Sequence, residues 1–84
     1  MMDGIRIEGA TAFQVQTSKD GDTWVPRQPG EPHESLSPGG DHWFTDRHQA
    51  WVAAINLRNN LMWSDVRLVG RDAAGRHVGE QNIE

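Results

Sequence analysis

The sequence predicts one α+β domain spanning residues 1–84, a two-layer ββαββ arrangement in which a single helix packs across an antiparallel sheet of two hairpins. Two stretches alternate apolar and polar residues around a turn, which is typical of β-hairpins. Between them lies a stretch with apolar residues at helical spacing. A sheet and a helix that are each apolar on one side bury those sides most economically against each other. The chain has enough residues for one such core and no more.

An N-terminal strand and hairpin are predicted over residues 5–28. Ile5 and Ile7 alternate with polar residues, which is typical of a short strand or the start of one. The stretch FQVQTSKDGDTWV then alternates in the same way up to a turn at Asp20-Gly21 and returns after it. Both strands of this hairpin are expected to turn one apolar face toward the helix.

The length of the Asp20-Gly21 loop decides which face of the sheet receives Trp24. A two-residue loop sets Trp24 opposite Thr17, on the face that carries the apolar residues. A three-residue loop sets Trp24 opposite Gln16 and moves the ring to the other face. We expect the first register, because it buries the apolar side chains together.

Residues 29–44 are predicted to form a loop that leads to the helix. The stretch PGEPHESLSPGGD, from Pro29 to Asp41, holds three prolines and three glycines. This composition favours turns and irregular structure. Long loops in small domains are either functional or disordered. We expect this one to be disordered or to become ordered only on a partner.

The helix is predicted over residues 45–60, with Thr45 as its N-cap and Asn59-Asn60 as its end. Its apolar residues form two adjacent lobes, one of Ala50, Ala54, Leu57 and Leu61 and the other of Trp51, Ile55 and Met62. Arg47 and Arg58 fall between these lobes. We expect their stems to cover apolar surface while their guanidinium groups reach water.

A C-terminal hairpin is predicted over residues 65–80, with its turn at Asp72 to Gly75. A two-residue or a four-residue loop would give the same pairing. The expected cross-strand pairs are Arg71 with Arg76, Arg67 with Glu80, and Val69 with Val78.

The pairing of Arg71 with Arg76 places like charges opposite each other, which destabilises a sheet unless something offsets the repulsion. Asp72 beside the turn or screening by solvent would offset it. The functional interpretation is that Arg67, Arg71 and Arg76 form a basic strip that binds the carboxylates or phosphates of a partner.

The stretch SPGGDHWFTDRHQAW raises the alternative of a metal-dependent hydrolase or nuclease accessory that uses His33, His42, Asp46 and His48. Their spacing matches no established ligand motif. A helix start with solvent-facing histidines, and with Trp43 or Phe44 packing as a hydrophobic staple, explains the same residues. We therefore expect no metal site here.

Other chemistry is not indicated by the sequence. The chain has no cysteine, no Gly-x-Ser-x-Gly motif and no glycine-rich phosphate loop. We expect no catalytic residues and no cofactor, and hence a protein that is not an enzyme. The net charge of -4 and the absence of a basic helix argue against a nucleic-acid partner. The lack of cysteine, of a signal peptide and of any run of about 20 apolar residues predicts a cytoplasmic protein that does not enter membranes.

The hairpin FQVQTSKDGDTWV, the helix opening FTDRHQAW and the strand DVRLV together resemble small uncharacterised α+β proteins of phages and prophages. That group includes compact anti-CRISPR-type inhibitors of bacterial defence. The resemblance covers most of the chain in order, and its motifs are generic. It implies a protein that occupies the surface of a host protein, and it assigns a role to no particular residue.

The leading hypothesis is a small non-enzymatic protein-binding module, a phage or mobile-element inhibitor or adaptor that acts on a host protein. Tryptophan and arginine are the residue types most enriched in interface hot spots. The expected contact surface consists of His33, Trp43, Arg67, Arg71 and Arg76. A further alternative is a homo-oligomer whose edge strand pairs with the same strand of a second copy.

Overall fold

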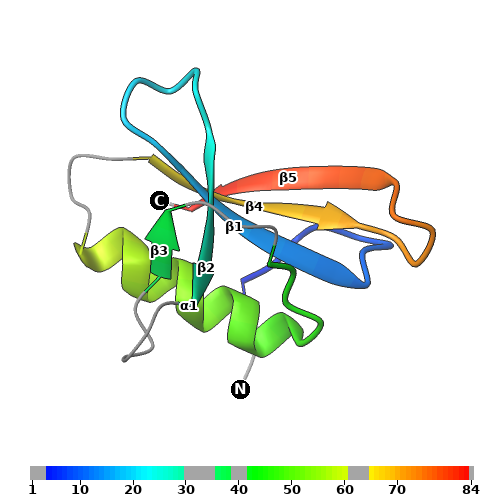
Figure 1. Cartoon of the computed structure of the whole chain (residues 1–84). Helices are drawn as coiled ribbons and strands as arrows, with labels where there is room; N and C mark the ends of the chain where they lie inside the picture. Colours follow the sequence, from blue (N-terminus) through cyan, green and yellow to red (C-terminus); the bar gives the residue numbers. More distant parts are fainter. Residues whose placement is uncertain (1–3, 30–35, 39–41, 61–64, 84) are drawn as a thin grey trace.

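In the computed structural model, which describes residues 4–29, 36–38, 42–60 and 65–83, one helix crosses one face of a 5-stranded antiparallel sheet (Figure 1). The elements are β1 (Ala12–Ser18), β2 (Val25–Pro29), β3 (Leu36–Pro38), α1 (Arg47–Asn60), β4 (Asp65–Arg71) and β5 (His77–Ile83). The strand order is β3-β2-β1-β4-β5, which places β1 at the centre of the sheet. The predicted two-layer α+β class is confirmed. Among the described residues, no helix has the length and apolar character to cross a membrane.

The core lies between α1 and the central strands β1 and β4. Alternation along the strands points Phe13, Val15 and Leu68 toward the helix, and all three side chains are fully buried. Ala50 and Ala54 of α1 are fully buried against them, and their small side chains allow the helix to approach the sheet closely. Full burial of a side chain the size of Phe or Leu contributes about 1.5–3 kcal/mol. The core therefore depends on these few contacts.

Helix α1 is capped by Asp46, so the prediction of Thr45 as the N-cap is wrong. Asp46 Oδ1 accepts a hydrogen bond from the backbone N–H of Gln49 at 3.1 Å. The Asp46 carbonyl accepts the first helical bond, from Ala50 N at 3.0 Å. A carboxylate in this place also interacts favourably with the positive end of the helix dipole. The helix is described up to Asn60, and residues 61–64 lie outside the described residues.

The two predicted apolar lobes of the helix are found where the structure describes them. Besides the two buried alanines, Trp51, Ile55 and Leu57 are half-buried and pack against the core. Leu61 and Met62 lie outside the described residues.

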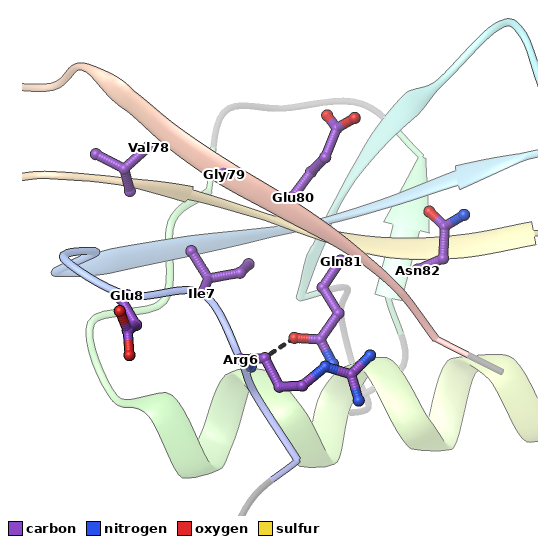
Figure 2. Close-up of a pocket in the computed structure, with 8 residues that line it drawn as sticks. All are labelled: Arg6, Ile7, Glu8, Val78, Gly79, Glu80, Gln81 and Asn82. Carbon is purple, nitrogen blue, oxygen red and sulfur yellow. Dashed lines mark hydrogen bonds between the residues drawn. The ribbon is translucent and has the colours of Figure 1, made fainter.

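Residues 4–11, here called the arm, form no strand and bend at Gly9, where φ is 79°, so the predicted N-terminal strand is wrong. Ile5 and Ile7 are nevertheless buried. The arm runs between α1 and β5 (Figure 2), and a side chain of β5 binds its backbone: the N–H of Arg6 donates to Gln81 Oε1 at 2.6 Å. The alternation of apolar and polar residues therefore reflects the burial of one side of the arm, although the arm is not a strand of the sheet.

Arg47 holds the arm from the helix side: the residue is exposed, and its guanidinium also binds the arm's backbone. Nη2 donates to the Ile5 carbonyl at 3.0 Å, and Nη1 donates to the Ile7 carbonyl at 3.4 Å. The guanidinium carbon lies 5.6 Å from the centre of the Phe13 ring. The carbonyls of Ile5 and Ile7, which are not paired with a strand, thus accept hydrogen bonds from Arg47.

A pair of glycines makes room for the arm on the sheet. Gly70 of β4 and Gly79 of β5 lie opposite each other. A Cβ atom on Gly70 would meet Ile7 Cγ2 and Ala10 Cβ at 2.8 Å, and one on Gly79 would meet Ile7 Cγ2 at 3.3 Å. Ile7 therefore packs against the sheet because both positions lack a side chain.

The hairpin of β1 and β2 has neither of the two predicted registers. Thr17 pairs with Val25 and Gln16 pairs with Pro26. Trp24 therefore lies just before β2, on the Gln16 side of the sheet. The preferred prediction, which placed the ring on the apolar face, is wrong.

The hairpin of β4 and β5 is also shifted relative to the prediction. Its turn falls at Asp72 to Gly75 as predicted, with Gly75 at φ 84°. Asp72 N donates to the Arg76 carbonyl at 2.9 Å, which leaves residues 73–75 as a loop with an odd number of residues. The predicted loops had even numbers of residues, so the expected pairs are wrong. The observed pairs are Arg71 with His77, Val69 with Glu80, and Arg67 with Asn82.

The predicted loop at residues 29–44 contains a strand that the composition did not indicate. β3 pairs with β2 at one edge of the sheet, with Pro29 opposite Leu36. Near the end of the same stretch, Phe44 forms an isolated bridge with Phe13. The expected disorder falls partly on residues 30–35 and 39–41, which lie outside the described residues.

Candidate binding surface

The face of the sheet opposite α1, here called the open face, carries the residues that alternate with the core residues on each strand. The pairing of the strands fixes which side chains share it. It includes Ala12, Gln14, Gln16 and Ser18 on β1, Pro26 on β2, Asp65, Arg67, Val69 and Arg71 on β4, His77, Glu80 and Asn82 on β5, and the tryptophans Trp24 and Trp43.

Arg67 and Trp24 form the first of two cation–π stacks on the open face. The guanidinium carbon lies 4.2 Å from the ring centre of Trp24. Arg67 Nε donates to Gln16 Oε1 at 2.8 Å, and Nη1 lies 3.3 Å from Glu80 Oε2. Only 19% of the Arg67 side chain is exposed. This guanidinium is engaged on its face and along its edge, so we assign it a structural role.

Arg71 and Trp43 form the second stack, with 4.2 Å between the guanidinium carbon and the ring centre. Phe13 N donates to the Phe44 carbonyl at 2.8 Å, and Phe44 N donates to the Phe13 carbonyl at 2.7 Å. Phe44 thereby continues the sheet beside β1 and turns its ring to the core. Alternation places the preceding residue, Trp43, on the open face, where Arg71 reaches it from β4.

Both stacks lie over the open side of β1. Arg71 pairs with Ala12, and Arg67 pairs with Gln16. Each arginine comes from β4, on one side of β1, and its tryptophan comes from the other side of β1. Ala12 is only 6% exposed and Ser18 only 3%, although they lie on the face away from the helix. A partly desolvated cation–π stack contributes about 0.5–2 kcal/mol.

The two stacked arginines differ in their hydrogen bonds. Arg67 has an amide and a carboxylate as acceptors, Gln16 and Glu80. Arg71 is half-buried like Arg67, but among the described residues its contact is the Trp43 ring, with no carboxylate or carbonyl paired to it. A guanidinium carries a planar set of N–H donors that matches carboxylate and phosphate oxygens. Arg71 is thus fixed in orientation and can donate to an external acceptor.

The structure brings some of the predicted contact residues together and separates others. Trp43, Arg67 and Arg71 share the open face. Arg76 lies at the turn between β4 and β5, where 83% of its side chain is exposed and Nε lies 3.9 Å from Asp72 Oδ2. The predicted cross-strand repulsion therefore does not arise, because Arg71 faces His77. His33 lies outside the described residues.

The residues of the alternative metal site have separate surroundings. The His42 ring packs edge-on against Phe44, with 4.6 Å between the ring centres. Asp46 caps α1, and His48 is exposed in its first turn. Within the part of the chain that the structure describes, no group of three or more His, Cys, Asp or Glu side chains is arranged to share a metal ion. His33 of the same alternative is not among those residues.

The three residues that contact Arg67 on the open face were not predicted to belong to the site: Trp24, Gln16 and Glu80. The second of the two hairpin registers placed Trp24 on the correct face, although its pairing was also wrong. Arg67 and Glu80 were predicted as a direct cross-strand pair; in the observed register Arg67 pairs with Asn82, and the ion pair with Glu80 forms diagonally.

A groove of about 670 Å³ runs between the arm and β5 (Figure 2). Arg6 and Glu8 line it from the arm, and Glu80, Gln81 and Asn82 line it from the strand. Its walls are polar, unlike the predominantly apolar, concave sites that bind most small molecules. The groove runs along β5 at the edge of the sheet, so we consider it together with that edge and not as a separate small-molecule site.

No protein-family model, curated protein or solved structure matches this chain. Its function is therefore inferred from the residues of the open face and of the sheet edge.

Proposed function

We propose that the protein is a non-enzymatic binding module that docks an acidic patch of a partner protein on the open face. Arg71 and Trp43 form the centre of the contact. One observation carries the proposal: the Arg71 guanidinium is stacked on Trp43 and has no hydrogen-bond acceptor among the described residues. Arginine and tryptophan are the residue types that dominate interface hot spots.

Stacking prepares Arg71 for a bidentate contact. The Trp43 ring restricts the plane of the guanidinium, so less side-chain entropy is lost when a carboxylate binds its edge. Two parallel N–H···O bonds to one carboxylate are stronger and more specific than a single neutral hydrogen bond. The half-buried indole beside them offers apolar area to the same partner.

The charges around the stack favour a protein over a nucleic acid. Glu80 lies on the same face and already pairs with Arg67, and the chain has a net charge of -4. Binding to a phosphate backbone needs several cations that neutralise successive phosphates. The stacked guanidinium of Arg71 suits a compact acidic patch instead. The resemblance to small phage and prophage proteins supports a bacterial host protein as the partner.

The test is affinity capture from nuclease-treated bacterial lysate on the immobilised protein, with quantification by mass spectrometry. Arg71→Glu is compared with Arg76→Glu, which makes the same charge change at the exposed turn. Loss of one member of a buried charge contact costs about 2–5 kcal/mol. We expect one partner that the wild type and Arg76→Glu retain and that Arg71→Glu loses more than about tenfold.

Circular dichroism of both variants verifies that the fold is retained. Equal capture by Arg71→Glu and the wild type would contradict the proposal. Equal loss with both variants would indicate nonspecific charge attraction, and retention that requires intact nucleic acid would indicate a different class of partner.

A further inference from the structure

The two edges of the sheet differ in their capacity to pair with another strand. The edge formed by β3 is 3 residues long and ends in Pro38, and its neighbour β2 ends in Pro29. Proline has no N–H and is a common means of blocking an edge. β5 is 7 residues long and contains no proline. An edge of this kind is a template for a further strand.

The hydrogen bonds of β1 determine which backbone groups of β5 face outward. Phe13 exchanges both of its backbone bonds with Phe44, so its N–H and C=O point away from β4. Its pair on β4, Gly70, therefore points toward β5, where it faces Gly79. Because these directions alternate along a strand, the backbone N–H and C=O of Glu80 point to the free edge.

By the same alternation, Asn82 points outward and Gln81 points inward. Glu80 and Asn82 are exposed, and both line the groove beside β5 (Figure 2). No backbone hydrogen bond joins this edge to another described segment. The arm contacts the strand through the Gln81 side chain, which leaves the outward backbone groups of its neighbours accessible.

We propose that β5 pairs antiparallel with β5 of a second copy, about a two-fold axis that passes through Gln81. In an antiparallel pair about a two-fold axis perpendicular to the sheet, a residue whose backbone groups point outward must lie opposite another such residue. Only a few positions of the axis along β5 meet this condition. An axis at Glu80 would oppose two carboxylates, which is destabilising. An axis at Gln81 pairs Glu80 of each copy with Asn82 of the other, and each such pair exchanges both backbone hydrogen bonds.

This pairing joins two sheets into one and places both open faces on the same side. The ladder is short, and interfaces that bury less than about 1,200 Å² in total are weak. We therefore expect a dimer that dissociates on dilution. The interface does not include Arg71 or Trp43, so the pairing is independent of the proposed function.

Charge changes at Asn82 test both the pairing and its register. Asn82 is exposed and faces Glu80 of the second copy in the proposed dimer. Asn82→Lys creates an opposite-charge pair, and Asn82→Glu creates a like-charge pair, each of them twice by symmetry. In sedimentation velocity over a concentration series, we expect dimer affinity to rise roughly three- to tenfold with the first variant and to fall by a similar factor with the second.

Amide hydrogen exchange supplies a second readout that does not depend on a variant. With rising protein concentration, the Glu80 and Asn82 amides should gain protection, while the inward amide of Gln81 is protected throughout. Three results would overturn the proposal: a monomer at concentrations near 1 mM, a dimer that responds equally to both Asn82 variants, or a dimer that Arg71→Glu disrupts. The last result would place the interface on the open face.

Discussion

Arg67 and Arg71 lie four positions apart on one strand, share one face and stack on tryptophans at the same distance of 4.2 Å. They differ in the acceptors that their guanidinium N–H groups find. Arg67 donates to Gln16 and pairs with Glu80, whereas the described part of the chain provides Arg71 with a ring alone. Arg71 lies directly after the bulge between Gly70 and Arg71, where its partner on β5 is His77.

Asp20 provides a prediction about pH at the residue scale. Backbone N–H groups of Thr23 and Asp22, together with the Ser18 hydroxyl, donate to its carboxylate and lower its pKa from 3.8 to about 2. A pKa that is lower in the folded state than in the unfolded chain stabilises the fold above the unfolded value. This stabilisation is complete above a pH of about 4 and is lost as the pH falls toward 2.

Asp20→Asn should therefore lower the free energy of unfolding at neutral pH and make it less dependent on pH between about 4 and 2. Urea denaturation at a series of pH values measures both effects. Asp22→Asn is the matched control, since it removes a charge at the same turn without removing the acceptor of these bonds. Identical acid sensitivity of Asp20→Asn and the wild type would contradict this account.

At the scale of elements, the sequence was sufficient to predict which helix and which hairpins form, and insufficient to predict how they pair. Both turns contain an aspartate that binds the backbone of its own loop: Asp20 accepts from Thr23 N, and Asp72 accepts from Arg76 N. These bonds set the loop lengths and hence the registers. A single sequence contains the aspartates but does not show which N–H groups they bind.

The arm and β3 also show that the sequence does not reveal which distant segments an element pairs with. Alternation at Ile5 and Ile7 correctly indicated burial, but the bonds that replace strand pairing come from Arg47 and Gln81, both distant in sequence. The short strand β3 lies in a stretch rich in proline and glycine, where local propensity argues against any strand. Tertiary pairing with β2 overrides that propensity.

The N-cap of α1 gives a prediction at this scale. Asp46→Ala removes the side-chain acceptor of the Gln49 N–H and should lower the free energy of unfolding by about 1 kcal/mol. Thr45→Ala, one residue earlier and exposed, should change it by less than about 0.5 kcal/mol. Thermal or urea denaturation distinguishes the two variants, and a larger effect of Thr45→Ala would restore that residue as the cap.

At the scale of the whole molecule, the helix and the arm cover one face of the sheet (Figure 1). The other face carries the two stacks. In our proposal, stability and binding therefore depend on opposite sides of the same strands. Phe13 of β1 and Leu68 of β4 are buried in the core. Ala12 and Arg71, which pair with each other on the same two strands, lie on the open face. A partner can bind the open face without disturbing the packing of the helix.

The most direct measurement of this division is nuclear magnetic resonance mapping of the isotope-labelled protein during titration with the captured partner. We expect the Arg71 side-chain N–H and Trp43 indole signals to shift first, together with amides of β1 and β4. The amides of Ala50 and Ala54 in α1 should remain unchanged. Shifts concentrated on α1, with the Arg71 and Trp43 signals unaffected, would contradict the assignment of binding to the open face.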